Sequence, residues 1–141
     1  MKSGIYRTES EEQTIALGRQ LGCGLKGAVL LIGNLGAGKT TLTKGIVEGL
    51  GVASADEVSS PTFTLVHQYG GDAGRAFHVD LYRLDEARQV ASLGLEDLFA
   101  GDGVVLLEWA ERFPELMPAE RTEIRIRALE GDVREIEVQA T

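Results

Sequence analysis

Two stretches of the chain are continuously apolar, at residues 28–32 and 104–107. Short apolar runs without polar interruption are typical of strands that are buried on both faces of a parallel sheet. Between them, apolar residues recur at helical spacing from Lys39 to about Leu50, and Gly51 is placed to end that helix. This succession of elements predicts an α/β fold.

Weaker signals add elements on both sides of this centre. Residues 4–8 favour a short strand, and a helix is expected after it. The capping-box pair of that helix is either Thr8 with Glu11 or Ser10 with Gln13. One hairpin is predicted from residues 63–69 and 75–81, and a second from residues 123–129 and 133–138. Two short helices are predicted at residues 85–93 and 95–100. We therefore expect a single α/β domain over residues 1–141, with a mostly parallel central sheet, antiparallel edge strands and flanking helices.

Charge narrows the classes of partner. Among 141 residues, 22 are acidic and 14 are Lys or Arg, which gives a net charge of −8. This excess argues against broad binding of a nucleic-acid backbone, which needs clustered basic residues. The nearest basic cluster is Arg121, Arg125 and Arg127, of which the last two alternate with isoleucines, as on the solvated face of a strand. An acidic surface suits a protein partner better.

Nothing in the sequence indicates a membrane. No apolar run approaches the roughly 18 residues that a membrane helix needs. The first residues turn acidic at once and lack the apolar core of a signal peptide. Cys23 is the one cysteine, so an internal disulfide is excluded, which fits a reducing compartment. We expect a cytoplasmic protein.

The segment after the first apolar run carries the most specific motif. It reads Gly33-Asn34-Leu35-Gly36-Ala37-Gly38-Lys39-Thr40 and fits G-x-x-x-x-G-K-[ST] at every fixed position. Glycines let backbone N–H groups converge on phosphate oxygens, and the helix that follows directs its positive end at the anion. Lys39 is expected to reach the β- and γ-phosphates, Thr40 to ligate Mg²⁺ and Thr41 to contact the α-phosphate. The expected α/β domain is therefore P-loop NTPase-like. We also expect Lys39 to be exposed when no ligand is bound.

The nucleotide is expected to be ATP, with GTP as the less favoured alternative. The sequence has no Asn-Lys-x-Asp motif of the kind that reads guanine, and this absence favours adenine. The predicted cofactors are therefore ATP and Mg²⁺.

Two carboxylates are candidates for the second half of the site. Glu108 ends the apolar run at 104–107, and Asp80 follows a strand-like segment. In P-loop proteins, a carboxylate at the end of a neighbouring strand holds Mg²⁺ or orients water. Ser60-Pro61-Thr62-Phe63 lies where switch loops sense the γ-phosphate, although a plain proline turn would have the same appearance. Thr62 is the candidate sensor.

At this point the chain resembles a known family. The resemblance is carried by the phosphate loop with Thr40-Thr41, then by Ser60-Pro61-Thr62-Phe63, His78-Val79-Asp80-Leu81-Tyr82-Arg83-Leu84, Leu95-Glu96-Asp97 and Glu108-Trp109-Ala110-Glu111. In this order the motifs look like the TsaE family, formerly YjeE, over about residues 30–118. The loop alone is generic, whereas the combination is specific.

The resemblance implies an ATPase of bacterial tRNA threonylcarbamoyladenosine synthesis. Its partners would be the TsaD and TsaB proteins, with tRNA approached only indirectly through that complex. By position in the motifs, Thr40 and Glu108 would ligate Mg²⁺, Asp80 would hold or activate the attacking water, and Trp109 would lie beside the nucleotide.

Several alternatives stay open on the sequence alone. A small-molecule kinase and a nucleotide-dependent interaction module with negligible turnover are both compatible with a phosphate loop. The kinase is disfavoured because no Arg-rich lid segment follows Glu108. Trp109 is either a core residue or part of the nucleotide site. His78 faces opposite to Val79 in the expected strand, so it is either structural or reaches the site or a partner.

Overall fold

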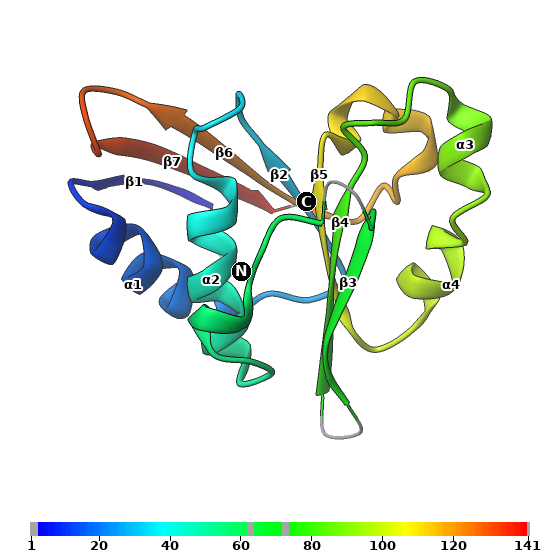
Figure 1. The fold of residues 1–141 in the computed structure, drawn as a ribbon, viewed down its shortest axis with the longest axis horizontal. Coiled ribbons are helices and arrows are strands. Elements are labelled where there is room, and N and C mark those ends of the chain that lie inside the picture. Colours follow the sequence, from blue (N-terminus) through cyan, green and yellow to red (C-terminus); the bar gives the residue numbers. More distant parts are fainter. Residues whose placement is uncertain (1–2, 62–63, 72–73, 141) are drawn as a thin grey trace.

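The computed structural model describes residues 3–61, 64–71 and 74–140. Over these residues, a seven-stranded sheet has the order β1-β7-β6-β2-β5-β4-β3 (Figure 1). The strands are β1 (Gly4–Thr8), β2 (Ala28–Ile32), β3 (Val66–Gly71), β4 (Gly74–Asp80), β5 (Val104–Glu108), β6 (Thr122–Ala128) and β7 (Arg134–Ala140). The helices are α1 (Glu11–Gly22), α2 (Lys39–Leu50), α3 (Ala87–Ala91) and α4 (Leu95–Ala100), with short 3₁₀ turns η1 (Ala55–Glu57), η2 (Ala110–Arg112) and η3 (Pro114–Leu116).

The four central strands are parallel. β2 pairs in parallel with both β5 and β6, and β5 pairs in parallel with β4. Antiparallel pairs extend the sheet at both edges, as β4–β3 on one side and as β6–β7–β1 on the other. The predicted fold class, with a parallel centre and antiparallel additions, is confirmed.

Element boundaries differ from the predicted ones where local hydrogen bonds compete with regular structure. β3 begins at Val66 rather than at residue 63, because Leu65 has φ of 70° and its N–H bonds to the carbonyl of Pro61. Residue 63 lies outside the described residues. α3 is shorter than the predicted 85–93, because the side chain of Gln89 accepts the backbone N–H groups of Asp85 and Glu86, which precede the helix. Local hydrogen bonds of this kind compete with regular structure.

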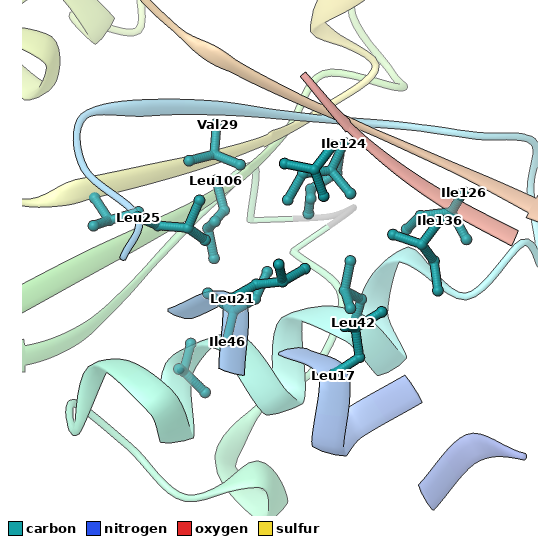
Figure 2. Packing of buried hydrophobic residues seen from close by; sticks show 14 of the residues in the cluster. Leu17, Leu21, Leu25, Val29, Leu42, Ile46, Leu106, Ile124, Ile126 and Ile136 are labelled. Atoms are coloured by element: carbon teal, nitrogen blue, oxygen red, sulfur yellow. The ribbon is translucent and has the colours of Figure 1, made fainter. Parts of the chain in front are cut away.

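Helices cover both faces of the sheet, with α1 and α2 on one side and α3 and α4 on the other (Figure 1). Figure 2 shows the first of the two cores, where leucines and isoleucines of the helices meet one face of the central strands. This cluster includes Leu17, Leu21, Leu42 and Ile46 from the helices and Val29, Leu31, Leu106 and Ile124 from the strands. The opposite face packs against Val90, Leu95, Phe113 and Met117. Both runs that the sequence marked as continuously apolar are thus buried on two faces.

α1 and α2 approach one another through glycines. A Cβ built on Gly45 would lie 2.0 Å from the carbonyl oxygen of Ile15, and one on Gly18 would lie 2.5 Å from that of Leu42. Gly22 and Gly49 repeat these contacts one turn further along. The backbones touch directly, so α2 is fixed against α1 and its first turn is held at the carboxyl edge of the sheet.

Among the described residues, none of the helices is both long and apolar enough to cross a membrane.

The glycine contact predicts a stability effect. Gly45→Ala should lower the free energy of unfolding by about 1–3 kcal/mol through overpacking, although alanine is the better helix former by about 1 kcal/mol. Urea denaturation followed by circular dichroism measures this change. Gly101→Ala is the control, since its Cβ would come no closer than 3.5 Å to any atom. Equal losses in the two variants would contradict direct backbone packing.

Candidate functional site

The phosphate loop runs from the end of β2 to the start of α2. Gly33 leaves no room for a side chain, because a Cβ there would lie 2.6 Å from the carbonyl oxygen of Ile126 in β6. Gly38 is the N-cap of α2 with φ of 110°, and no side chain caps the helix. Only glycine adopts this conformation without strain. The uncapped first turn of α2 therefore presents backbone N–H groups and the positive end of the helix dipole at the loop.

Strand register brings the two predicted carboxylates together. The Cα atoms of Asp80 in β4 and Glu108 in β5 are direct partners, and Glu108 is also the partner of Leu31 in β2. Because the carboxyl ends of parallel strands lie at one edge of a sheet, the loop after β2 and both carboxylates meet there. Open α/β sheets bind ligands in a crevice at this edge.

Lys39 differs from its predicted exposure. Only 5% of the residue is exposed, and Nζ donates to the carbonyl oxygen of Gly33 at 2.8 Å. Nζ also lies 3.9 Å from Oε1 of Glu108 and 3.8 Å from the ring centroid of Trp109. The expectation of an exposed lysine was wrong, because without a ligand the ammonium is stabilised by a carboxylate, a carbonyl and an indole face.

Burial shifts the pKa of Lys39. Loss of hydration lowers the pKa of its ammonium below the ordinary value, while the nearby carboxylates of Glu108, Glu111 and Asp80 act in the opposite direction. The negative charges therefore favour the charged form that phosphate binding needs.

Trp109 belongs to the site and is not a core residue only. It has φ of 66°, in the left-handed region that non-glycine residues rarely adopt. This turn directly after β5 directs the half-buried indole over Lys39. The ring of Tyr82 lies against the indole at 5.2 Å between centroids. The two aromatic rings form one wall beside the lysine.

Asp80 is buried and held from two sides. Its Oδ1 accepts the backbone N–H of Tyr82 at 2.8 Å, and its Oδ2 lies 3.4 Å from Oγ of Ser60. Ser60 belongs to the predicted switch loop, so that loop and the carboxylate are in contact. Thr62, the predicted sensor in the same loop, lies outside the described residues.

These groups line one cleft of about 390 Å³. Its walls include Leu35, Gly36, Gly38, Lys39, Thr40 and Thr41 from the loop and α2, with Ser60, Asp80, Tyr82, Glu108 and Trp109 opposite them. Gly36 faces open space, since a Cβ on it would meet nothing within 4 Å. Of the other predicted loop residues, Gly33 packs against Ile126 and Ala37, Ala37 is buried, and Asn34 is exposed.

Four further residues of the cleft were missed by sequence reasoning, namely Glu11, Thr14, Asp132 and Arg134. Arg134 is the most informative of them. Its Nε donates to the carbonyl oxygen of Ala37 at 2.7 Å, and its Nη1 bonds to the carbonyls of Gly131 and Val133. β7 thus braces the phosphate loop across 97 positions of sequence. No local pattern marks such a contact.

The arrangement fits a nucleotide with Mg²⁺. A buried ammonium beside an uncapped helix start suits phosphate oxygens. The Thr40 hydroxyl and the Glu108 carboxylate supply the oxygen ligands that a hard cation prefers. In the described part of the chain, no three His, Cys, Asp or Glu side chains are grouped to hold a metal ion. A site with few protein ligands is usual for Mg²⁺ that also binds water and phosphate.

A family model described as threonylcarbamoyl adenosine biosynthesis protein TsaE matches residues 8–136. The chain belongs to the TsaE family. A relative from Bacillus subtilis is 42% identical over 138 residues, covering 96% of this chain and 85% of the relative. Another from Streptomyces coelicolor is 44% identical over 121 residues, covering 82% of this chain and 80% of the relative. Both are named tRNA threonylcarbamoyladenosine biosynthesis protein TsaE.

The fold agrees with that of a solved protein from Bacillus subtilis. The crystal structure of Bacillus subtilis YdiB superposes with a TM-score of 0.78 at 36% identity, covering 99% of this chain and 86% of that one. The TsaE resemblance expected from the motifs is therefore confirmed by sequence and by structure. The names of the TsaE relatives connect the family with threonylcarbamoyladenosine biosynthesis on tRNA.

The position of Lys39 predicts an optical signal for ligand binding. Trp109 is the one tryptophan of the chain, and Lys39 lies over its ring. If ATP draws the ammonium away, tryptophan emission should change on titration.

Lys39→Ala should weaken the binding of ATP about ten- to hundredfold, because hydrogen bonds to charged groups contribute roughly 1.5–3 kcal/mol. Lys26→Ala, an exposed charge-matched control, should titrate like the unaltered protein. Equal affinities for both variants would contradict the role of Lys39.

Proposed function

We propose that this chain binds ATP with Mg²⁺, hydrolyses the ATP, and serves tRNA threonylcarbamoyladenosine biosynthesis together with TsaB and TsaD. The observation that carries the proposal is the meeting of Lys39, Asp80 and Glu108 with the phosphate loop in one cleft. Membership of the TsaE family supports the pathway. The whole chain acts as a single P-loop ATPase domain.

The phosphates occupy the loop. The backbone of residues 33–38 and the start of α2 surround the β-phosphate, and Thr41 contacts the α-phosphate. Lys39 exchanges its contacts with Gly33 and Glu108 for oxygens of the β- and γ-phosphates. The ammonium then keeps a negative partner in both states, so ligand binding leaves no buried charge unpaired.

Thr40 and Glu108 would hold Mg²⁺. When bound, the cation neutralises negative charge on the transferred phosphoryl group. The departure of Lys39 from Glu108 frees Oε1 of this carboxylate for the metal. The same movement therefore prepares both halves of the site.

Asp80 orients the attacking water. Its carboxylate is fixed by the Tyr82 backbone and by Ser60, so an oxygen is held in place to accept a proton from water. Thr62 senses the γ-phosphate from the switch loop. Contact between Ser60 and Asp80 links that loop to the water site.

Hydrolysis depends on protein partners. Arg134 borders the cleft, but its guanidinium is engaged with backbone carbonyls of the loop and of the β6–β7 turn. A partner is then needed to order the switch loop or to add charge at the γ-phosphate. The net charge of −8 favours docking on a protein over direct contact with tRNA, which is reached through the TsaB–TsaD pair in the cytoplasm.

Substitutions should distinguish the roles of the two carboxylates. Glu108→Gln should remove the Mg²⁺-dependent part of ATP binding, because a neutral amide is a poor ligand for a hard cation. Asp80→Asn should keep that binding and lose hydrolysis. Calorimetry with and without Mg²⁺, followed by phosphate release, distinguishes the two. The opposite pattern would show that the roles are exchanged.

Partner dependence is the test of the pathway. ATP hydrolysis should be slow for the isolated chain and faster with the TsaB–TsaD pair, and association should differ between ATP and ADP. Supply of an arginine finger accelerates hydrolysis by about 10³–10⁵, and ordering of a loop alone should give less. Purified components are mixed with either nucleotide, and association and phosphate release are followed together. Absence of association with both nucleotides would remove the pathway assignment. Association without hydrolysis would indicate a nucleotide-dependent interaction module instead.

A further inference from the structure

A buried histidine touches the proposed metal ligand. His78 in β4 is 0% exposed, and its Nε2 lies 2.5 Å from Oε2 of Glu108. A fully buried imidazole needs a reason, because an apolar side chain would fill the same space without losing hydration. None of the roles proposed above for Lys39, Thr40 and Asp80 uses it.

The sheet register places His78 on the same face of the sheet as Glu108. The partner of His78 in β5 is Leu106, so Glu108 is two residues further along on the same face. Leu106 belongs to the core under α1 and α2, whereas Val79 belongs to the core on the opposite face. His78 therefore lies between the core and the cleft, on the side of the phosphate loop.

The two oxygens of Glu108 have different neighbours. Oε2 is the oxygen bonded to His78, and Oε1 is the oxygen nearest the Lys39 ammonium at 3.9 Å. With Glu108 ionised, its oxygens only accept hydrogen bonds, so this contact requires Nε2–H of the imidazole as its donor. Nδ1 of His78 is buried without a hydrogen-bond partner. Among the described residues, the hydrogen bond to Glu108 is thus the one polar contact of this ring.

We propose that His78 is a positioning residue of the Mg²⁺ site, because its Nε2–H holds Oε2 of Glu108 and leaves Oε1 for the cation. This inference rests on the proposed Mg²⁺-dependent binding of ATP. Without the imidazole, Oε2 loses its donor, and the carboxylate turns toward Lys39 as the nearest cation. The closer ion pair then competes with Mg²⁺ for the carboxylate. Partners that orient a metal ligand in this way typically change metal affinity about 10–100-fold when removed.

The experiment measures Mg²⁺ affinity in the presence of ATP. Calorimetric Mg²⁺ titrations compare the unaltered protein with His78→Leu, which fills the space with an apolar side chain, and His78→Gln, which keeps an N–H donor at a similar reach. His78→Leu should weaken Mg²⁺ about 10–100-fold and change Mg²⁺-free ATP binding much less. His78→Gln should recover part of the loss, which a merely space-filling role would not allow. His67→Leu is the control, since the second histidine bonds to Tyr69 and not to the carboxylate.

A second measurement needs no variant, which matters if a buried substitution unfolds the chain. Long-range ¹H–¹⁵N spectra of the full chain report which imidazole nitrogen carries the proton. A proton on Nε2 of His78 supports the inference, and a neutral ring protonated only on Nδ1 overturns it. Unchanged Mg²⁺ affinity in a folded His78→Leu protein also overturns it. If the unaltered protein binds ATP equally with and without Mg²⁺, the proposed function fails first, and the inference fails with it.

Discussion

One buried positive charge organises this protein. Lys39 is almost completely shielded from water, so its ammonium requires compensation inside the fold. That compensation comes from the end of β5, where Glu108 supplies the charge and Trp109 the indole face, and from the Gly33 carbonyl at the end of β2. All three are in place only if β2 and β5 are parallel neighbours in one register. The topology of the central sheet and the charge of the loop therefore depend on each other.

The same constraint explains why the buried ammonium is paired in the ligand-free cleft. A buried ion pair contributes little net stability, because desolvation of both charges offsets their attraction. The ion pair between Lys39 and Glu108 is thus better understood as a contact in which each side chain can take a different partner when a ligand binds. In the proposed function, phosphate replaces the carboxylate as the partner of Lys39, and Mg²⁺ replaces the lysine as the partner of Glu108. Burial lowers the pKa of Lys39 and the surrounding carboxylates oppose this shift, which favours the charged form for that exchange.

Parts of the chain far from the motifs hold this geometry. Glycine contacts between α1 and α2 bring the start of α1 to the cleft, where Glu11 and Thr14 line it. Arg134 in β7 bonds to the carbonyl of Ala37, so the C-terminal hairpin supports the phosphate loop. The antiparallel additions at the edge of the sheet are therefore part of the site and not only a cover for the core.

The sequence by itself determined the local features of this protein. The phosphate loop, the apolar runs of β2 and β5 and the whole of α2 follow from residue type and short spacing, and they were predicted with correct or nearly correct limits. Carboxylates at strand ends were also predicted, because parallel strands end at a common edge. The predicted roles of Thr62, Asp80 and Glu108 stay predictions. The tertiary structure alone decided the burial of Lys39, the brace from Arg134 and the contact between His78 and Glu108. Each of these joins residues far apart in the chain, and which side chains meet depends on strand register and helix packing, which no local pattern encodes.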